Sequence, residues 1–105
     1  MSTAIGLETL RFEFPGSKTL PAFAPVLVGV IGSGNLEILL EDVGGKKCSF
    51  EVQTSARGFG QIWEAVLGDF QMRHDLSGVQ VTIHDMGATP AVVSLRLSQA
   101  AAELA

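Results

Sequence analysis

Residues 26–41 read Val-Leu-Val-Gly-Val-Ile-Gly-Ser-Gly-Asn-Leu-Glu-Ile-Leu-Leu-Glu, two apolar runs on either side of a Gly-Ser-Gly-Asn centre. The runs, 26–31 and 36–41, have the length of strands, and the glycine-rich centre favours a hairpin turn at Ser33 and Gly34. The pairs that this turn predicts on the buried face are Ile31–Leu36, Gly29–Ile38 and Leu27–Leu40. A slip of one residue would turn two glutamates of the second run into the core, so the pattern favours this register.

Three further segments alternate apolar and polar residues with the period of two that is typical of a half-buried strand. Their inward positions are Leu10, Phe12 and Phe14; Cys48, Phe50, Val52 and Thr54; and Val79, Val81 and Ile83. Pro15-Gly16 ends the first strand, and residues 17–25, which contain two prolines, predict a surface loop. A turn at Gly44-Gly45-Lys46 is expected before the second strand.

Between the last two of these strands the apolar residues recur at helical spacing. They form one stripe, Phe59, Ile62, Trp63, Val66, Leu67 and Phe70. We expect Trp63 to be a core residue, and Thr54 or Ser55 to help begin the helix.

The C-terminal segment fits two patterns. Thr89-Pro90 is typical of a helix start, whereas Val93, Leu95 and Leu97 alternate like a strand. We expect a strand over 92–98 with a short helical tail. The predicted fold over residues 1–105 is therefore a single α+β domain, a mainly antiparallel sheet of about five strands with one main amphipathic helix packed on one face.

Composition excludes several classes of function. The 105 residues carry a net charge of −4, which argues against nucleic-acid binding, and the sequence contains no cluster of Lys and Arg of the kind that such binding needs. The longest apolar run, 26–31, is far shorter than the ~20 residues needed to span a bilayer, and the first residues do not resemble a signal peptide. A single cysteine, Cys48, excludes an internal disulfide. We expect a cytoplasmic protein with no direct membrane binding.

The strand that runs into Gly32-Ser33-Gly34 invites a dinucleotide-binding interpretation, but the following residues contradict it. Glu37 stands where the third glycine of G-x-G-x-x-G would fall, and residues 36–41 alternate as a strand instead of beginning a helix. No Gly-Lys-Ser/Thr follows, so a Walker-type phosphate loop is excluded as well. By spacing alone, Gly-Ser-Gly-Asn is a hairpin turn, and a serine at its tip is open to a modifying enzyme.

The spacing of the residues does not decide whether Ser33 carries a modification, and a resemblance to a known family bears on this question. Residues 28–40, together with His84-Asp-Met-Gly-Ala-Thr-Pro90 and Val92-Val-Ser-Leu-Arg-Leu97, resemble the acyl-carrier (delta) subunit of malonate decarboxylases. The citrate lyase acyl-carrier subunit is more distantly similar. The likeness covers nearly the whole chain. The sequence departs from the family's usual pattern at Asn35, where an Asp is usual, and at Met86, where a Phe is usual. Asn35 removes a charge beside the site.

The resemblance implies a non-catalytic carrier whose cofactor is attached covalently. By motif match Ser33, between Gly32 and Gly34, would hold 2′-(5″-phosphoribosyl)-3′-dephospho-CoA through a phosphodiester. Malonyl and acetyl thioesters on this arm would pass between the other malonate decarboxylase subunits, namely the acyl-carrier transferase and the decarboxylase. A malonyl transferase and a prosthetic-group transferase are further implied partners. No metal site is expected, because two histidines and scattered carboxylates offer too few ligands.

Two alternatives to a carrier stay open. One is an interaction subunit without an arm, and the other is a small enzyme that uses Cys48 or His84. Cys48 is in phase with Phe50 and Val52, which predicts a core residue and not a nucleophile. His84 and Asp85 are neighbours on a strand and point to opposite faces, so they cannot form a simple dyad.

Overall fold

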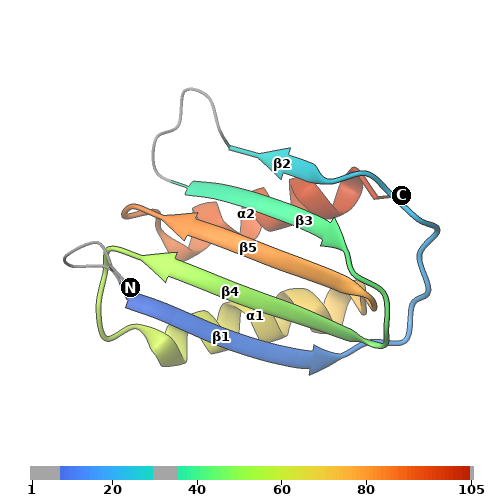
Figure 1. The fold of residues 1–105 in the computed structure, drawn as a ribbon. Helices are drawn as coiled ribbons and strands as arrows, with labels where there is room; N and C mark the ends of the chain where they lie inside the picture. Colours follow the sequence, from blue (N-terminus) through green and yellow to red (C-terminus); the bar gives the residue numbers. More distant parts are fainter. Residues whose placement is uncertain (1–7, 30–35, 105) are drawn as a thin grey trace, which may run out of the picture.

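A computed structural model describes residues 8–29 and 36–104, which form five strands and two helices (Figure 1). In chain order the elements are β1 (Glu8–Pro15), β2 (Val26–Val28), β3 (Leu36–Asp42), β4 (Lys47–Thr54), α1 (Gly60–His74), β5 (Val79–Asp85) and α2 (Pro90–Ala102). The α+β class and the five-stranded sheet are confirmed. Residues 17–25 are a connection without strand or helix apart from one isolated bridge, between Lys18 and Leu76.

The five strands form one sheet in the order β1-β4-β5-β3-β2. β5 lies in the middle, where it pairs in parallel with β4 and antiparallel with β3. The other described pairs, β1 with β4 and β2 with β3, are antiparallel. The parallel pair is joined by α1, as a parallel pair requires, because a tight hairpin cannot connect two parallel strands.

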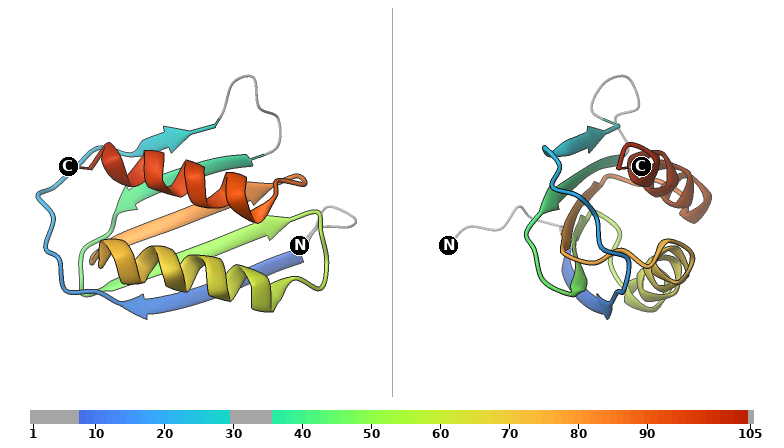
Figure 2. Two further views of the ribbon diagram at one scale, coloured as in Figure 1. Left: turned by 180° about the vertical axis from the view of Figure 1, so that it is seen from behind. Right: turned by 90° about the vertical axis from the view of Figure 1, so that its right-hand side faces the viewer.

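Both helices cover the same face of the sheet and leave the other face open (Figure 2). The second helix corrects our expectation of a strand over 92–98. Val93, Leu97, Ala100 and Ala101 are buried at helical spacing, whereas Leu95, which completed the apparent alternation, is 56% exposed. Thr89 caps the helix by accepting a hydrogen bond from the Val92 N–H at 3.3 Å, and Pro90 occupies its first turn. The capping signal was correct and the strand alternation was accidental.

The core lies between the sheet and the helices. The alternating positions predicted in β3, β4 and β5 are buried, and those of β1 pack against them partly exposed. Phe50 makes edge-to-face contacts with Phe14 and Phe70, which joins β1, β4 and α1. Trp63 is 6% exposed, so its predicted core position is confirmed.

The start of α1 differs from our expectation. The residue at the N-cap is Phe59, which makes no side-chain capping bond, and Gly58 before it has a φ of +86°. Thr54 does not begin the helix, because its hydroxyl is used at the end of the sheet, as described below. Neither Thr54 nor Ser55 lies within α1.

The hairpin register that we predicted is wrong by one residue. Val26 pairs with Leu40 and Val28 with Ile38, so Leu27 lies opposite Leu39 and is 51% exposed. The prediction for β3 itself is confirmed, since its leucines at 36 and 40 face the core. The error has a physical cause: the run 26–31 contains no polar residue, so its own alternation does not indicate which face is buried.

Within the described residues, no helix is long and apolar enough to cross a membrane.

Candidate attachment site and its surroundings

Ser33, Gly32 and Gly34 lie in residues 30–35, outside the described part of the chain, as does the predicted turn. The segments that enter and leave them are described. Gly29 follows β2 with a φ of +90°, and a Cβ built on it would lie 2.2 Å from the Leu36 carbonyl oxygen. This closeness holds the two chain segments together at the base of the candidate site. It also explains why glycine stands at 29, because any larger residue would collide with the opposite backbone.

Three strand ends meet beside this base. Leu36, the first residue of β3, pairs with Asp85, the last residue of β5, and Asp85 pairs with Thr54 at the end of β4. Figure 1 shows the start of β3 next to the ends of β4 and β5 at one edge of the molecule. The three side chains point to the helix-covered face, where each is at most 3% exposed.

Asp85 organises this end of the sheet through both of its carboxylate oxygens. Oδ2 accepts a hydrogen bond from the Thr54 hydroxyl at 2.8 Å, and Oδ1 accepts one from the Ala88 N–H, also at 2.8 Å. The Asp85 carbonyl oxygen accepts from the Ser55 N–H at 3.0 Å. Burying a carboxylate is costly unless it is hydrogen-bonded, and here both oxygens are satisfied.

The hydrogen bonds of Asp85 give a structural role to the segment 84–90, which the sequence analysis used only as a family motif. The carboxylate fixes the turn after β5, Gly87 takes the positive φ of +106° that the turn needs, and Thr89-Pro90 then begins α2. Our sequence reasoning missed this role of Asp85. The sequence signal was Asp85 shortly before Gly87. This arrangement is typical of a turn, in which the aspartate side chain accepts a hydrogen bond from a nearby backbone N–H.

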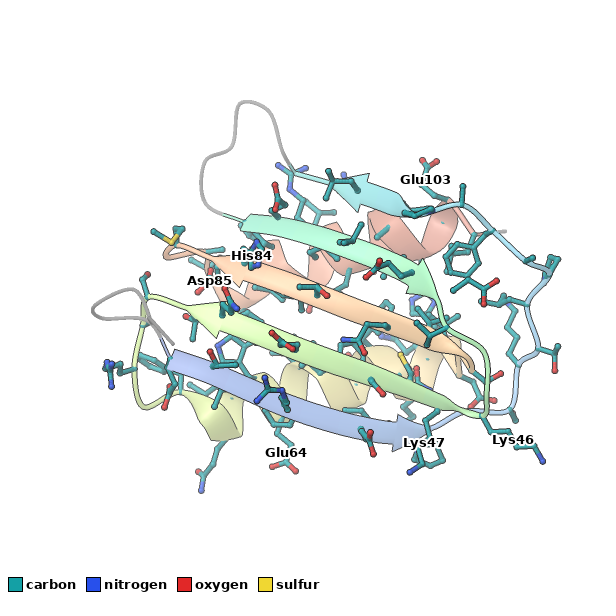
Figure 3. All side chains as sticks on the ribbon, viewed as in Figure 1. Lys46, Lys47, Glu64, His84, Asp85 and Glu103 are labelled. Atoms are coloured by element: carbon teal, nitrogen blue, oxygen red, sulfur yellow. The ribbon has the colours of Figure 1, made fainter. Side chains whose placement is uncertain are left out.

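His84 points to the opposite, open face of the sheet, as predicted (Figure 3). Its Nδ1 lies 3.2 Å from Glu37 Oε1, with both side chains well exposed. Thus His84 and Asp85 do not form a dyad. A solvent-exposed pair of this kind contributes roughly 0–1 kcal/mol to stability, and it shows no arrangement for catalysis.

Cys48 is fully buried, as predicted, at the end of the sheet where β4 begins and away from Asp85. Burial raises the pKa of the Cys48 thiol from 9.0 to about 12, so the thiol stays protonated at neutral pH. The thiolate is the reactive form of cysteine, which makes this side chain unsuited to nucleophilic catalysis. No group of three or more potential metal ligands occurs in residues 8–29 and 36–104.

A cavity of about 290 Å³ opens beside Asp85, between the N-terminal halves of α1 and α2. Its walls are mostly apolar and include Phe59, Ile62, Trp63 and Val66 from α1 and its cap, with Val93 from α2. Phe59 and Ile62, at its rim, are each 46% exposed. Asp85 is the ionisable side chain in the lining, and both of its carboxylate oxygens are engaged in the hydrogen bonds described above.

The model of one protein family, described as malonate decarboxylase delta subunit (MdcD), matches residues 24–104. A malonate decarboxylase acyl carrier protein from Burkholderia cepacia is 68% identical and covers 100% of this chain and 99% of its own. A protein of the same description from Acinetobacter calcoaceticus is 48% identical over 90% of this chain and 93% of its own.

The structure is similar to one chain in a crystal structure of a Pseudomonas malonate decarboxylase hetero-tetramer in complex with malonate. The TM-score is 0.81 at 42% sequence identity, and the match covers 93% of this chain and 99% of that one. The Burkholderia and Acinetobacter relatives are named as acyl carrier proteins. This agrees with a protonated Cys48 thiol and with side chains of His84 and Asp85 that do not contact each other. The chain belongs to the malonate decarboxylase delta subunit family.

Proposed function

We propose that this chain carries malonyl and acetyl groups as thioesters on 2′-(5″-phosphoribosyl)-3′-dephospho-CoA, attached to Ser33 by a phosphodiester. The observation that carries the proposal is the position of Gly32-Ser33-Gly34 between two paired strands. β2, an edge strand, pairs with β3 on either side of this segment in the sequence, which supports an attachment site that a modifying enzyme could reach. Membership of a family of acyl carriers supports a prosthetic group, and the motif match supports its identity and its position.

The surrounding residues fit such a group. β2 is an edge strand of only three residues, so its outer side is not covered by another described strand. The tight approach of Gly29 to Leu36 fixes the base from which the arm would extend. When bound, the group supplies a thiol that binds acyl groups as thioesters.

The chain itself would hold the arm, position it and present it to the partner subunits. The turn held by Asp85 and the capped start of α2 lie beside the base of the site, next to Leu36. Tethering keeps an acyl group at roughly millimolar effective concentration near each partner's active site, provided that the linker can reach it. No described side chain needs to act as an acid, a base or a nucleophile in this role.

The relative of known structure is part of a hetero-tetramer, which supports other malonate decarboxylase subunits as partners of this chain. We propose that the acyl-carrier transferase and decarboxylase subunits receive the loaded arm. The malonyl transferase would load it, and the prosthetic-group transferase would attach it. The cytoplasm is the proposed location.

Intact mass of the chain purified from its native host tests the proposal directly. We expect an increase that equals one phosphoribosyl-dephospho-CoA group, located at Ser33 by peptide mapping and absent from Ser33→Ala. An unmodified chain in a host that is growing on malonate would support an interaction subunit without an arm. A modified Ser33→Ala chain would place the attachment at another serine, with Ser49, Ser55 and Ser94 as the next candidates.

A further inference from the structure

We propose that the apolar cavity beside Asp85 is a resting seat for the thioester end of the chain's own arm, and that it accepts an acetyl thioester in preference to a malonyl thioester. This inference rests on the proposed attachment of the arm at Ser33. It assigns a second role to the chain, which would shelter the acetyl group between reactions as well as tether it.

The first support is proximity. Leu36 and Asp85 are paired residues of adjacent antiparallel strands, whose Cα atoms lie about 5 Å apart. Ser33 is three residues before Leu36, and three residues span at most about 11 Å of chain. The Cα atom of Ser33 is therefore held within roughly 16 Å of the Cα atom of Asp85, which lines the cavity. An arm that contains a phosphoribosyl group, a nucleotide, a pyrophosphate and a pantetheine in series is long enough to return over this distance.

The second support is the size of the cavity. Small-molecule sites usually occupy about 300–1,000 Å³, so a volume of about 290 Å³ lies at the lower end of that range. It suits the sulfur end of the arm with a two-carbon acyl group. It does not suit the nucleotide portion, which would also bring phosphates against an apolar wall.

The third support is the chemistry of the walls. The lining is apolar except for Asp85, and none of the lining residues, all of which are in the described ranges, is a lysine, an arginine or a histidine. A malonyl thioester would bring a free carboxylate close to the carboxylate of Asp85, with no cation in the lining to offset the repulsion. An acetyl thioester has no charge. Burying its methyl group and the adjacent methylenes is favourable by about 25 cal/mol for each Å² of apolar surface removed from water.

The fourth support is the exposure of the rim. Phe59 and Ile62 each keep 46% of their surface exposed, although both belong to the apolar stripe of α1. An aromatic and an aliphatic side chain at the rim of the cavity would be covered in part by a flexible thioester chain that lies across them.

The test uses the full chain, first modified by purified transferase and then charged with ¹³C-labelled acetyl or ¹³C-labelled malonyl groups. Intact mass verifies each state before any spectrum is recorded. For the acetyl form we expect nuclear Overhauser contacts from the labelled methyl group to the Trp63 indole and to the methyl groups of Val66 and Val93. Trp63 is the sole tryptophan of the chain, so its indole signal is assigned without ambiguity. For the malonyl form we expect these contacts to be absent.

A matched pair of variants tests whether binding in the cavity protects the thioester from hydrolysis. Ala56→Leu places a larger side chain in the lining, while Ala65→Leu makes the same change at an exposed position of α1 outside the lining. If the acetyl end is seated nine-tenths of the time, filling the cavity should speed its spontaneous hydrolysis about tenfold. The control should hydrolyse at the wild-type rate, and circular dichroism should show that both variants are folded.

The contacts in the wild-type chain decide the proposal without any variant. A correctly modified and acetylated chain that shows no contact to the cavity would overturn the seat and leave the carrier function intact. Equal contacts in both acyl forms would overturn the preference for acetyl. Cavity signals that change only when a transferase or decarboxylase subunit is added would assign the cavity to a partner instead. A chain that the transferase cannot modify would overturn the attachment and the seat together.

Discussion

Asp85 should be one of the most destabilising positions in the chain to truncate, although it lies far from the centre of the core. In Asp85→Ala the Thr54 hydroxyl and the Ala88 N–H both lose a charged acceptor at 2.8 Å. Hydrogen bonds to charged groups contribute about 1.5–3 kcal/mol each, and a buried donor left unsatisfied adds its desolvation cost.

Part of this loss is recovered at Thr54, because the Ala56 carbonyl oxygen lies 3.4 Å from the hydroxyl and offers a poorer acceptor. We therefore expect a loss of roughly 3–4 kcal/mol, a large share of the 5–15 kcal/mol that is typical of a small domain. Asp85→Asn keeps one acceptor oxygen and replaces the other by an N–H donor, so it should cost about half as much.

The assay is urea denaturation followed by circular dichroism, for wild type, Asp85→Ala, Asp85→Asn, Thr54→Val and the double variant Thr54→Val with Asp85→Asn. Because the two side chains are in contact, we expect a coupling energy of about 0.5–3 kcal/mol. His84→Ala, the neighbouring residue on the open face, is the control and should change stability by less than about 1 kcal/mol. A loss below 1 kcal/mol for Asp85→Ala, or additive effects in the cycle, would refute the assignment of Asp85 as the organiser of this end of the sheet.

Four further outcomes are expected. Trp63→Ala should lower the free energy of unfolding by about 3–5 kcal/mol because Trp63 is a nearly buried core residue, and a denaturation midpoint that hardly moves would contradict this. Gly29→Val should strain the base of the candidate site, because its Cβ would meet the Leu36 carbonyl oxygen. We expect the transferase to modify this variant more slowly than Gly45→Val, where a Cβ meets nothing within 4 Å, and intact mass measures both rates. Cys48 should react with a thiol reagent at pH 8 only at the rate of unfolding. Because the pKa of its thiol is raised in the folded state, the unfolded state loses the proton first as the pH rises. The free energy of unfolding should therefore fall between about pH 9 and about pH 12, and should not fall for this reason in Cys48→Ala. Ser33→Ala should keep its stability within 1 kcal/mol but remain unmodified and abolish malonate turnover in the assembled complex, and turnover by the variant would disprove the attachment site.

Strand positions were predictable wherever polar and apolar residues alternate strictly. β1, β4 and β5 appear where expected because a polar side chain marks the outward face at every second position, and β3 follows the same pattern except at Leu39. β2 lacks such marks, and its register was consequently wrong by one residue. In α2, Leu95 is apolar but exposed, so an accidental alternation outweighed a correct capping signal at Thr89.

The site was predictable only in part, because its organising contacts join segments far apart in the chain. The hydrogen bond between Thr54 and Asp85 spans 31 residues and depends on the parallel pairing of β4 with β5. No local pattern at Thr54 indicates a partner in β5, and its hydroxyl was instead assigned to the start of a helix. The cavity likewise forms only because two helices pack side by side on one face, an arrangement that requires the second helix.

The central place of β5 also constrains the order in which the chain can fold during synthesis. β1 can pair with β4, and β2 with β3, as soon as each pair has left the ribosome, but neither pair contacts the other through the sheet. Among the described strands only β5, residues 79–85 of 105, joins the two pairs. Until most of the chain has been made, the nascent protein therefore holds two separate ribbons, each with one apolar edge strand awaiting a partner, which is the state most exposed to wrong pairing. Synthesis of the last quarter of the chain, which brings β5 and then α2, closes the sheet and completes the cover that α1 begins on its apolar face.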